Sequence, residues 1–134
     1  MSLRVDNLSW GHPLPGGEWR SLFREFSLHC PQGQFVVVIG SNGSGKSTLL
    51  KSLLGIVRPR TGVVHLRGQD VTQRATHHIA NLGVAYVPEG RGIFGNLSVK
   101  ENLLMCARPG LHGQRHWTFE RVMDQFPRLS ERLG

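Results

Sequence analysis

Long hydrophobic runs and clustered cysteines are missing from this sequence of 134 residues. No apolar stretch reaches about 18 residues, so we expect no membrane-spanning helix. The N-terminus has no apolar core of a secretory signal. Cys30 and Cys106 lie far apart and outside any metal-binding spacing, which is typical of reduced thiols in a cytosolic protein. The length and the lack of internal repeats indicate one domain.

Clusters of basic residues are also missing, although the chain carries 16 basic and 9 acidic residues and a formal net charge of +7. Arginines and lysines never occur three in a row, and they do not alternate with aromatic residues. Nucleic-acid interfaces usually concentrate basic charge on one face. We therefore expect a solvated basic surface that helps to attract small anions, and no nucleic-acid partner.

The most informative stretch is Gly40–Thr48, which fits the phosphate-loop pattern G-x-x-x-x-G-K-[ST]. It follows the unbroken apolar run 35–39, which predicts a buried parallel strand. The residues after it share one helical face: Leu49, Leu50, Leu53, Leu54 and Val57. A strand, a glycine-rich loop and a helix in this order predict a nucleotide site in an α/β fold.

The residue types in the loop suit phosphate chemistry. Glycines let backbone N–H groups approach phosphate oxygens, and the helix N-terminus adds a positive dipole. Lys46 would bring a positive charge to the β- and γ-phosphates, and the hydroxyl of Ser47 would bind Mg²⁺. The predicted phosphate contacts are Ser41, Asn42, Gly43, Ser44, Gly45, Lys46, Ser47 and Thr48.

Hydrophobic patterns and turn residues predict the remaining elements. The expected strands span 2–9, 22–29, 62–68 and 84–87, and the expected helices span 76–83, 98–109 and 119–126. The loop 10–19 contains Trp10 and Trp19, and either indole would suit stacking on an adenine ring or plain packing on the domain.

Glu89 follows the apolar segment 84–87 directly. Ligands of open α/β sheets bind beyond the carboxyl ends of the strands, so a carboxylate there would be placed to meet a magnesium ion or its water. A surface glutamate in a glycine-rich turn explains the same residues, and the local sequence leaves both interpretations open.

Three motifs together identify a family. They are the phosphate loop with its Thr48-Leu49-Leu50 extension, the segment Gly83–Arg91 and the segment Phe94–Leu103. Over residues 3–128 the chain resembles the nucleotide-binding subunits of ABC transporters, and its Val-Pro-Glu-Gly-Arg segment is most similar to ATPases of branched-chain amino-acid and urea importers. The resemblance implies a P-loop NTPase fold, with an antiparallel β part at the N-terminus and a partial parallel sheet flanked by helices.

The resemblance also implies roles for individual residues. ATP and Mg²⁺ would be the cofactors, Trp10 would stack on adenine with Trp19 as the alternative, and Lys46 would stabilise transition-state charge. Glu89 stands where most members have a glutamine that touches Mg²⁺, and a carboxylate there changes the local charge. Exposed apolar residues would contact a membrane permease: Ile93, Phe94 and Leu97.

Other hallmarks of the family are missing from the sequence. It contains no Leu-Ser-Gly-Gly-Gln signature, no later apolar strand ending in Asp-Glu and no switch histidine. Residues 1–134 therefore resemble a partial nucleotide-binding domain, from the phosphate loop (Walker A) to the start of the helical subdomain. We expect this part to bind ATP without turning it over, because the general base lies outside it.

In the complete protein, the resemblance implies a second ATPase subunit, permease subunits and a position on the cytoplasmic face of the plasma membrane. ATP binding and hydrolysis would drive uptake of an amino acid or a related solute. Two alternatives stay open. One is another P-loop kinase or GTPase, although no Asn-Lys-x-Asp motif is present. The other is a docking module that binds a membrane partner without hydrolysing ATP.

Overall fold

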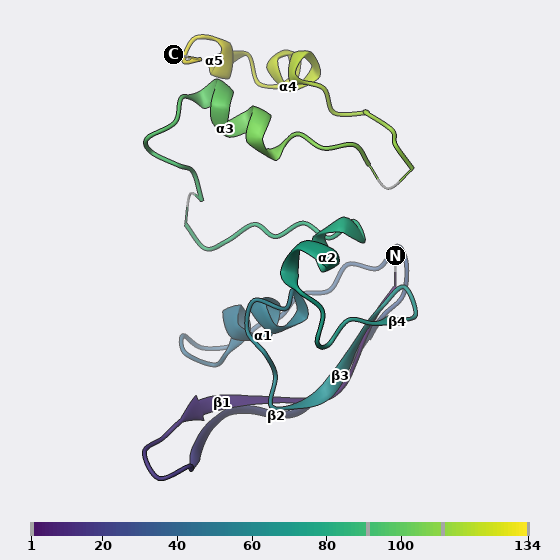
Figure 1. Ribbon diagram of the computed structural model, residues 1–134, viewed down its shortest axis with the longest axis vertical. Coiled ribbons are helices and arrows are strands. Elements are labelled where there is room, and N and C mark those ends of the chain that lie inside the picture. Colours follow the sequence, from purple (N-terminus) through teal and green to yellow (C-terminus); the bar gives the residue numbers. More distant parts are fainter. Residues whose placement is uncertain (1, 91, 111, 134) are drawn as a thin grey trace. The chain divides into compact units, whose positions relative to one another are not determined.

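The computed structural model describes residues 2–90, 92–110 and 112–133. It divides into two compact units, Met1–Ala85 and Tyr86–Gly134. Figure 1 labels their helices and strands in chain order. Each unit is described by itself.

The first unit is built on an antiparallel sheet with the strand order β2-β1-β3-β4 (Figure 1). The strands span Leu3–Pro13 in β1, Trp19–Cys30 in β2, Thr61–Leu66 in β3 and Gln69–Asp70 in β4. The expected antiparallel part is thus confirmed. The predicted loop at 10–19 is wrong in length, because Trp10–Pro13 continue to pair with β2 and leave only 14–18 as the turn. Local Pro and Gly content does not reveal such cross-strand pairing.

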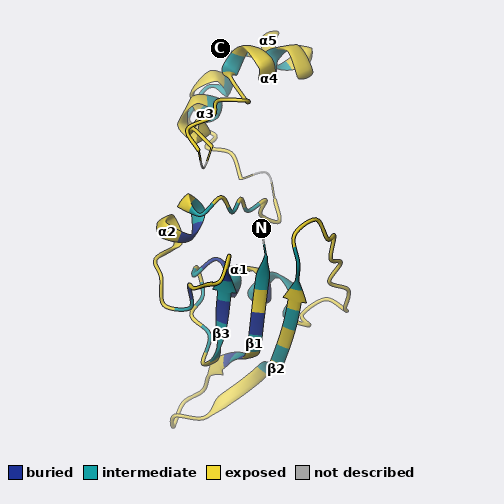
Figure 2. Cartoon of the chain, turned by 90° about the vertical axis from the view of Figure 1, so that its right-hand side faces the viewer, coloured by how far each residue is buried: buried dark blue, intermediate teal, exposed yellow. Residues whose placement is uncertain are grey.

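One face of this sheet carries the core. Val5 and Leu8 of β1 are buried, as are Val64 and Leu66 of β3, and Figure 2 shows these dark-blue positions along the two central strands. Helices α1 (Lys46–Leu53) and α2 (Thr76–Asn81) lie on one side of the sheet (Figure 1). They and the adjoining turns supply the other buried apolar residues: Leu49, Leu54, Val71 and Ile79. Each such side chain stabilises the fold by roughly 1.5–3 kcal/mol through burial.

Two bulges bend the β1–β2 hairpin. Asn7 and Glu25 have positive φ angles of 50° and 49°, and the register shifts beside them. The Asn7 N–H donates to Ser27 Oγ at 2.9 Å, and the Glu25 N–H donates to Ser9 Oγ at 2.9 Å. Two hydroxyls thus replace ladder partners that the bulges remove, so the hairpin bends without leaving these N–H groups unpaired.

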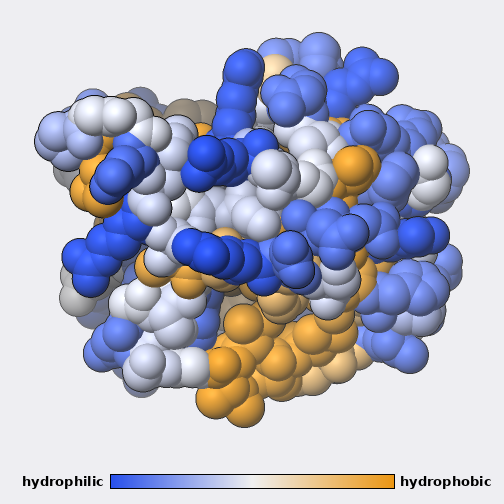
Figure 3. Space-filling view, turned by 90° about the horizontal axis from the view of Figure 1, so that it is seen from below, coloured by the Kyte–Doolittle hydropathy of each residue, from blue (hydrophilic) through white to orange (hydrophobic). Residues whose placement is uncertain are grey.

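The parallel strands expected at 35–39 and 84–87 are not formed. Neither segment belongs to a sheet among the described residues, and Phe35, Ile39 and Val87 are 91%, 88% and 88% exposed. Figure 3 shows hydrophobic side chains gathered in one area of the surface. A parallel strand exists only when neighbours accept and donate its backbone hydrogen bonds. The apolar pattern indicates a buried strand but does not supply those neighbours.

The second unit is helical, with α3 (Val99–Cys106), α4 (Phe119–Gln125) and α5 (Pro127–Ser130). A capping box starts α3, because Glu101 N–H donates to Ser98 Oγ at 3.2 Å and Ser98 N–H donates to Glu101 Oε2 at 2.8 Å. Hydrogen bonds from the Ser98 N–H and hydroxyl lower the pKa of the Glu101 carboxyl, since they stabilise its charged form. Pro127 ends α4 and occupies the first turn of α5.

No helix in the described parts of either unit is long and apolar enough to cross a membrane. This agrees with the lack of long hydrophobic runs in the sequence.

A close backbone approach between β1 and β3 yields a stability prediction. Gly62 has a φ of +94°, and a Cβ there would lie 2.5 Å from Asn7 O and 2.5 Å from Leu8 Cα. Gly68 has a similar φ of +79° with nothing within 4 Å of the same position. In urea unfolding of the full chain, Gly62→Ala should lose about 1–3 kcal/mol more than the matched control Gly68→Ala. Equal losses would show that β1 and β3 do not approach this closely.

Candidate functional site

The predicted phosphate loop runs directly into α1. Gly43 and Gly45 adopt φ angles of +79° and +95°, which favour glycine. Ser44 N–H donates to Ser41 O at 3.2 Å, and Leu49 N–H donates to Gly45 O at 2.7 Å as the helix begins. The helix starts at Lys46, within the loop as expected, and ends at Leu53, before Leu54 and Val57 of the apolar pattern.

Two loop glycines have close neighbours. A Cβ on Gly45 would lie 3.0 Å from Leu22 Cγ and 3.2 Å from Phe23 Cδ1, and a Cβ on Gly40 would lie 2.6 Å from Ser44 Oγ. The loop therefore packs closely against β2 and against itself. Sequence reasoning missed Leu22 and Phe23 as supports of the loop, because the bulge at Glu25 breaks the period-two pattern of β2.

Lys46 bends back across the loop. Its Nζ donates to Gly40 O and to Ser41 O, both at 2.8 Å. The first turn of α1 carries no acidic residue, so the N–H groups and dipole of the helix start add to the ammonium charge. A lysine ammonium beside a glycine loop at a helix N-terminus is a site for an anion with several oxygens, such as a polyphosphate.

The other predicted phosphate contacts line the same loop and helix start. Ser41, Asn42 and Ser44 are exposed, whereas Ser47 and Thr48 are half-buried in the first turn of α1. Thr48 O accepts from the hydroxyl of buried Ser52 at 2.9 Å, which ties this turn to the next one. The structure thus keeps the predicted set together on one short segment.

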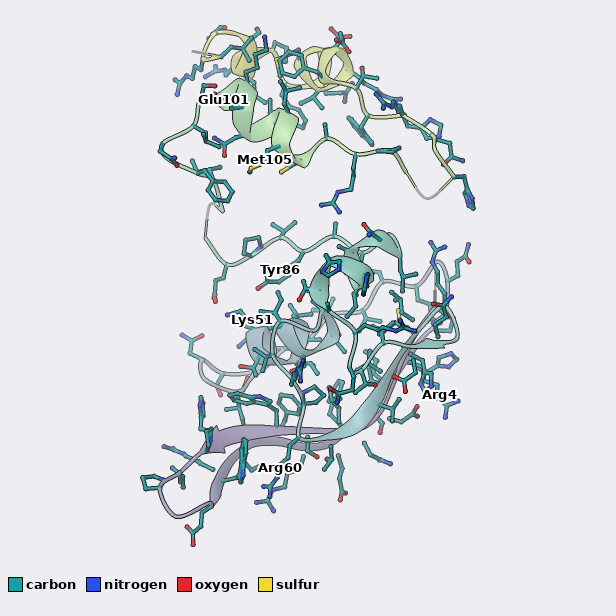
Figure 4. All side chains as sticks on the ribbon, viewed as in Figure 1. Arg4, Lys51, Arg60, Tyr86, Glu101 and Met105 are labelled. Atoms are coloured by element: carbon teal, nitrogen blue, oxygen red, sulfur yellow. The ribbon has the colours of Figure 1, made fainter. Side chains whose placement is uncertain are left out.

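The two tryptophans of the hairpin lie in different surroundings. Trp10 pairs across the strands with Phe23, the residue that contacts the Gly45 position, and its ring meets His12 edge-on at 4.7 Å between centroids. Trp19 instead lies under the Arg60 guanidinium, 4.9 Å from the ring centroid. Figure 4 shows Arg60 on the side of the sheet away from α1. Only Trp10 is therefore linked by direct neighbours to the phosphate loop.

The residues of the loop suit an Mg²⁺ ion that is bound together with a polyphosphate. They suit less well a metal ion whose ligands all come from the protein. Among the described residues, no group of three or more His, Cys, Asp or Glu side chains is placed to hold a metal. The loop offers glycine backbone, an ammonium and the Ser47 hydroxyl, while Mg²⁺ usually takes its remaining oxygens from phosphates and water. Glu89 is exposed and belongs to the second unit, so its predicted metal role stays a prediction.

The second unit presents an apolar turn before α3. Ile93 and Phe94 are 65% and 53% exposed, and Leu97 is half-buried. Asn102 holds this turn: its Oδ1 accepts from Phe94 N–H at 2.9 Å, and its Nδ2 donates to Phe94 O at 3.0 Å and to Leu97 O at 3.1 Å. Sequence reasoning missed Asn102, since its partners lie five and eight residues away.

Comparisons with known proteins match this arrangement to one family. A family model described as "ABC transporter" matches residues 23–132. The probable branched-chain amino acid transport ATP-binding protein LivF of Archaeoglobus fulgidus is 38% identical over 98 residues, covering 73% of this chain and 42% of the relative. The high-affinity branched-chain amino acid transport ATP-binding protein BraG of Pseudomonas aeruginosa is 35% identical over 108 residues, covering 81% and 46%.

Another relative is named for a different solute. The phosphonates import ATP-binding protein PhnC of Trichormus variabilis is 43% identical over 91 residues, covering 68% of this chain and 36% of the relative. The chain thus spans less than half the length of these three relatives.

Solved structures agree with the sequence relatives. A structure of an ATP-binding subunit of an ABC transporter superposes with a TM-score of 0.74 at 26% identity, and the match covers 99% of this chain and 53% of that one. The resemblance drawn from the phosphate loop and from residues 83–103 is confirmed, and the chain belongs to the ABC transporter family.

Proposed function

We propose that residues 1–134 form part of the nucleotide-binding domain of an importer ATPase, and that this part holds ATP with Mg²⁺. The observation that carries the proposal is the Lys46 ammonium, held 2.8 Å from two loop carbonyls at the N-terminus of α1. Membership of the family supports ATP and Mg²⁺ as the cofactors. It also argues against the alternative of a P-loop kinase or GTPase.

The chain's own groups would act by positioning and by charge. Backbone N–H groups of the loop and of the first turn of α1 donate to phosphate oxygens. Lys46 exchanges its bonds to Gly40 O and Ser41 O for bonds to the β- and γ-phosphates, and the Ser47 hydroxyl binds the ion. When bound, Mg²⁺ neutralises phosphate charge and orients the oxygens. Phosphoryl transfer depends mainly on such positioning and charge stabilisation.

Hydrolysis needs a group that the sequence does not contain. A water-orienting base is required in addition to the phosphate cradle, and no apolar strand after Val87 ends in two acids. We therefore infer that this part of the protein binds Mg–ATP with negligible turnover, and that turnover belongs to the complete domain. A docking module that binds a membrane partner without hydrolysis remains the second candidate, supported by the exposed turn at Ile93 and Phe94.

The names of the relatives support amino-acid uptake as the process served. In this proposal the chain works with permease subunits and a second ATPase subunit on the cytoplasmic face of the membrane. The turn at Ile93, Phe94 and Leu97 would contact the permease, because exposed apolar side chains held in a rigid turn suit a protein contact.

Lys46→Ala tests the phosphate site. Removing a charged donor to phosphate should weaken Mg–ATP binding by about 10- to 100-fold, since such a bond contributes roughly 1.5–3 kcal/mol. Titration with a fluorescent ATP analogue would measure it. Lys51→Ala is the matched control, because Lys51 lies in the last turn of the same helix. Equal effects of both substitutions would contradict the site, and phosphate release by the unaltered chain well above that of Lys46→Ala would contradict the lack of turnover.

Trp10→Ala tests base stacking. Stacking of a base on an aromatic ring contributes about 1–3 kcal/mol, so the substitution should weaken ATP binding by about 5- to 150-fold. Binding of inorganic triphosphate should stay unchanged, because that ligand has no base. Trp19→Ala is the comparison, and it should leave ATP affinity near that of the unaltered chain. A larger loss with Trp19→Ala would move the stacking role to Trp19.

Phe94→Asp tests the partner contact. A carboxylate in an apolar interface is costly to desolvate, so capture of co-expressed permease subunits should fall at least about tenfold while ATP binding stays unchanged. Phe126→Asp is the matched control, because Phe126 is similarly exposed in the same unit, at 57% against 53%. An equal loss of capture with both variants would argue against a specific permease contact at Phe94.

A further inference from the structure

A cavity lies on the sheet, and most of its lining residues take no part in the nucleotide proposal. It has a volume of about 420 Å³ and lies over β1, between Trp19, Ser21 and Glu25 of β2 and Arg60 beside β3. Ser9 and Trp10 of β1 also line it. Figure 4 shows Arg60 on this side, away from α1.

Small paired residues lie in the hollow: Ser9 of β1 pairs with Thr61 of β3, and Gly11 of β1 pairs with Ser21 of β2. The Ser9 hydroxyl accepts the Glu25 N–H at 2.9 Å, which fixes Glu25 in its bulge at a φ of 49°. The Arg60 N–H donates to Ser9 O at 2.8 Å and fixes the opposite wall. A non-glycine residue at positive φ costs of order 1–3 kcal/mol, and such strain is concentrated at functional sites. The bulge brings an acidic side chain to the rim of the cavity.

Three kinds of recognition group meet in this cavity. The Trp19 indole is 38% exposed and offers an apolar wall. The Arg60 guanidinium stacks on that ring, which leaves its N–H edges directed outward in the guanidinium plane. Glu25 supplies a carboxylate, and among the described residues neither Glu25 nor Arg60 takes part in a salt bridge. Arg24 adds a second basic group.

We propose that this cavity binds a free α-amino acid with an apolar side chain. The ligand's ammonium pairs with Glu25, its carboxylate accepts from Arg60 and Ser21, and its side chain lies against Trp19. A zwitterion satisfies both charged walls at once, whereas a ligand with a single charge leaves one of them unpaired. The volume falls in the range of small-molecule sites. The cavity shares Trp10 with the proposed adenine contact, whereas Glu25, Arg60 and Ser21 take no part in the nucleotide proposal.

The test uses the full chain and L-leucine as the probe. Calorimetry with the unaltered chain measures the binding directly and leaves Trp10, which also lines the cavity, in place. L-Leucine should give a saturable heat curve. 4-Methylpentanoate lacks the ammonium and 3-methylbutylamine lacks the carboxylate, and each should bind at least about tenfold more weakly.

Charge variants then assign the two walls. Glu25→Gln should remove the preference for L-leucine over 4-methylpentanoate, and Arg60→Gln should remove its preference over 3-methylbutylamine. Glu18→Gln and Arg58→Gln are matched controls, because both residues are exposed and lie outside the lining of the cavity. These controls should keep both preferences.

Three outcomes would overturn the proposal: no saturable response to L-leucine up to the order of 10 mM, analogues that bind as tightly as L-leucine, or control variants with the same effect as the cavity variants. Titration with Mg–ATP on the same samples separates the two proposals. Retained L-leucine binding without ATP binding contradicts only the nucleotide site, and the reverse contradicts only the cavity.

Discussion

The contact between Gly45 and β2 is the constraint on which the phosphate site depends. A Cβ on Gly45 would lie 3.0 Å from Leu22 Cγ and 3.2 Å from Phe23 Cδ1, so these side chains would have to shift, and the φ of +95° also favours glycine. This contact attaches the start of α1 to the hairpin and so aims the helix N-terminus and Lys46 at one point. Once the loop is held there, the charge of Lys46 and the dipole of α1 act on the same anion.

The β1–β2 hairpin contributes both to the core and to the cavity. Leu8 is buried in the core, whereas Ser9 and Trp10 line the cavity. The bulges at Asn7 and Glu25 bend the hairpin, and the Ser27 and Ser9 hydroxyls satisfy the N–H groups that the bend exposes.

Local chemistry made part of this structure predictable. The glycine loop and the helix that begins at it follow from residues a few positions apart, and both were predicted. The strand predicted at 35–39 does not form, because its pairing partners must come from elsewhere in a chain. Leu22, Phe23 and Asn102 were missed for a related reason: their roles depend on residues that a bulge or a turn brings near them.

The exposed segment 35–39 also bears on nucleotide affinity. The loop is supported on one side by β2 and α1, while the five residues before it are exposed and outside any sheet in the described chain. A nucleotide that binds here must also order the Gly40 end of the loop. The entropic cost of that ordering weakens the binding. Burial of 35–39 between sheet neighbours would order the same end in advance. We therefore expect the order of segment 35–39, in addition to Lys46, to affect phosphate affinity.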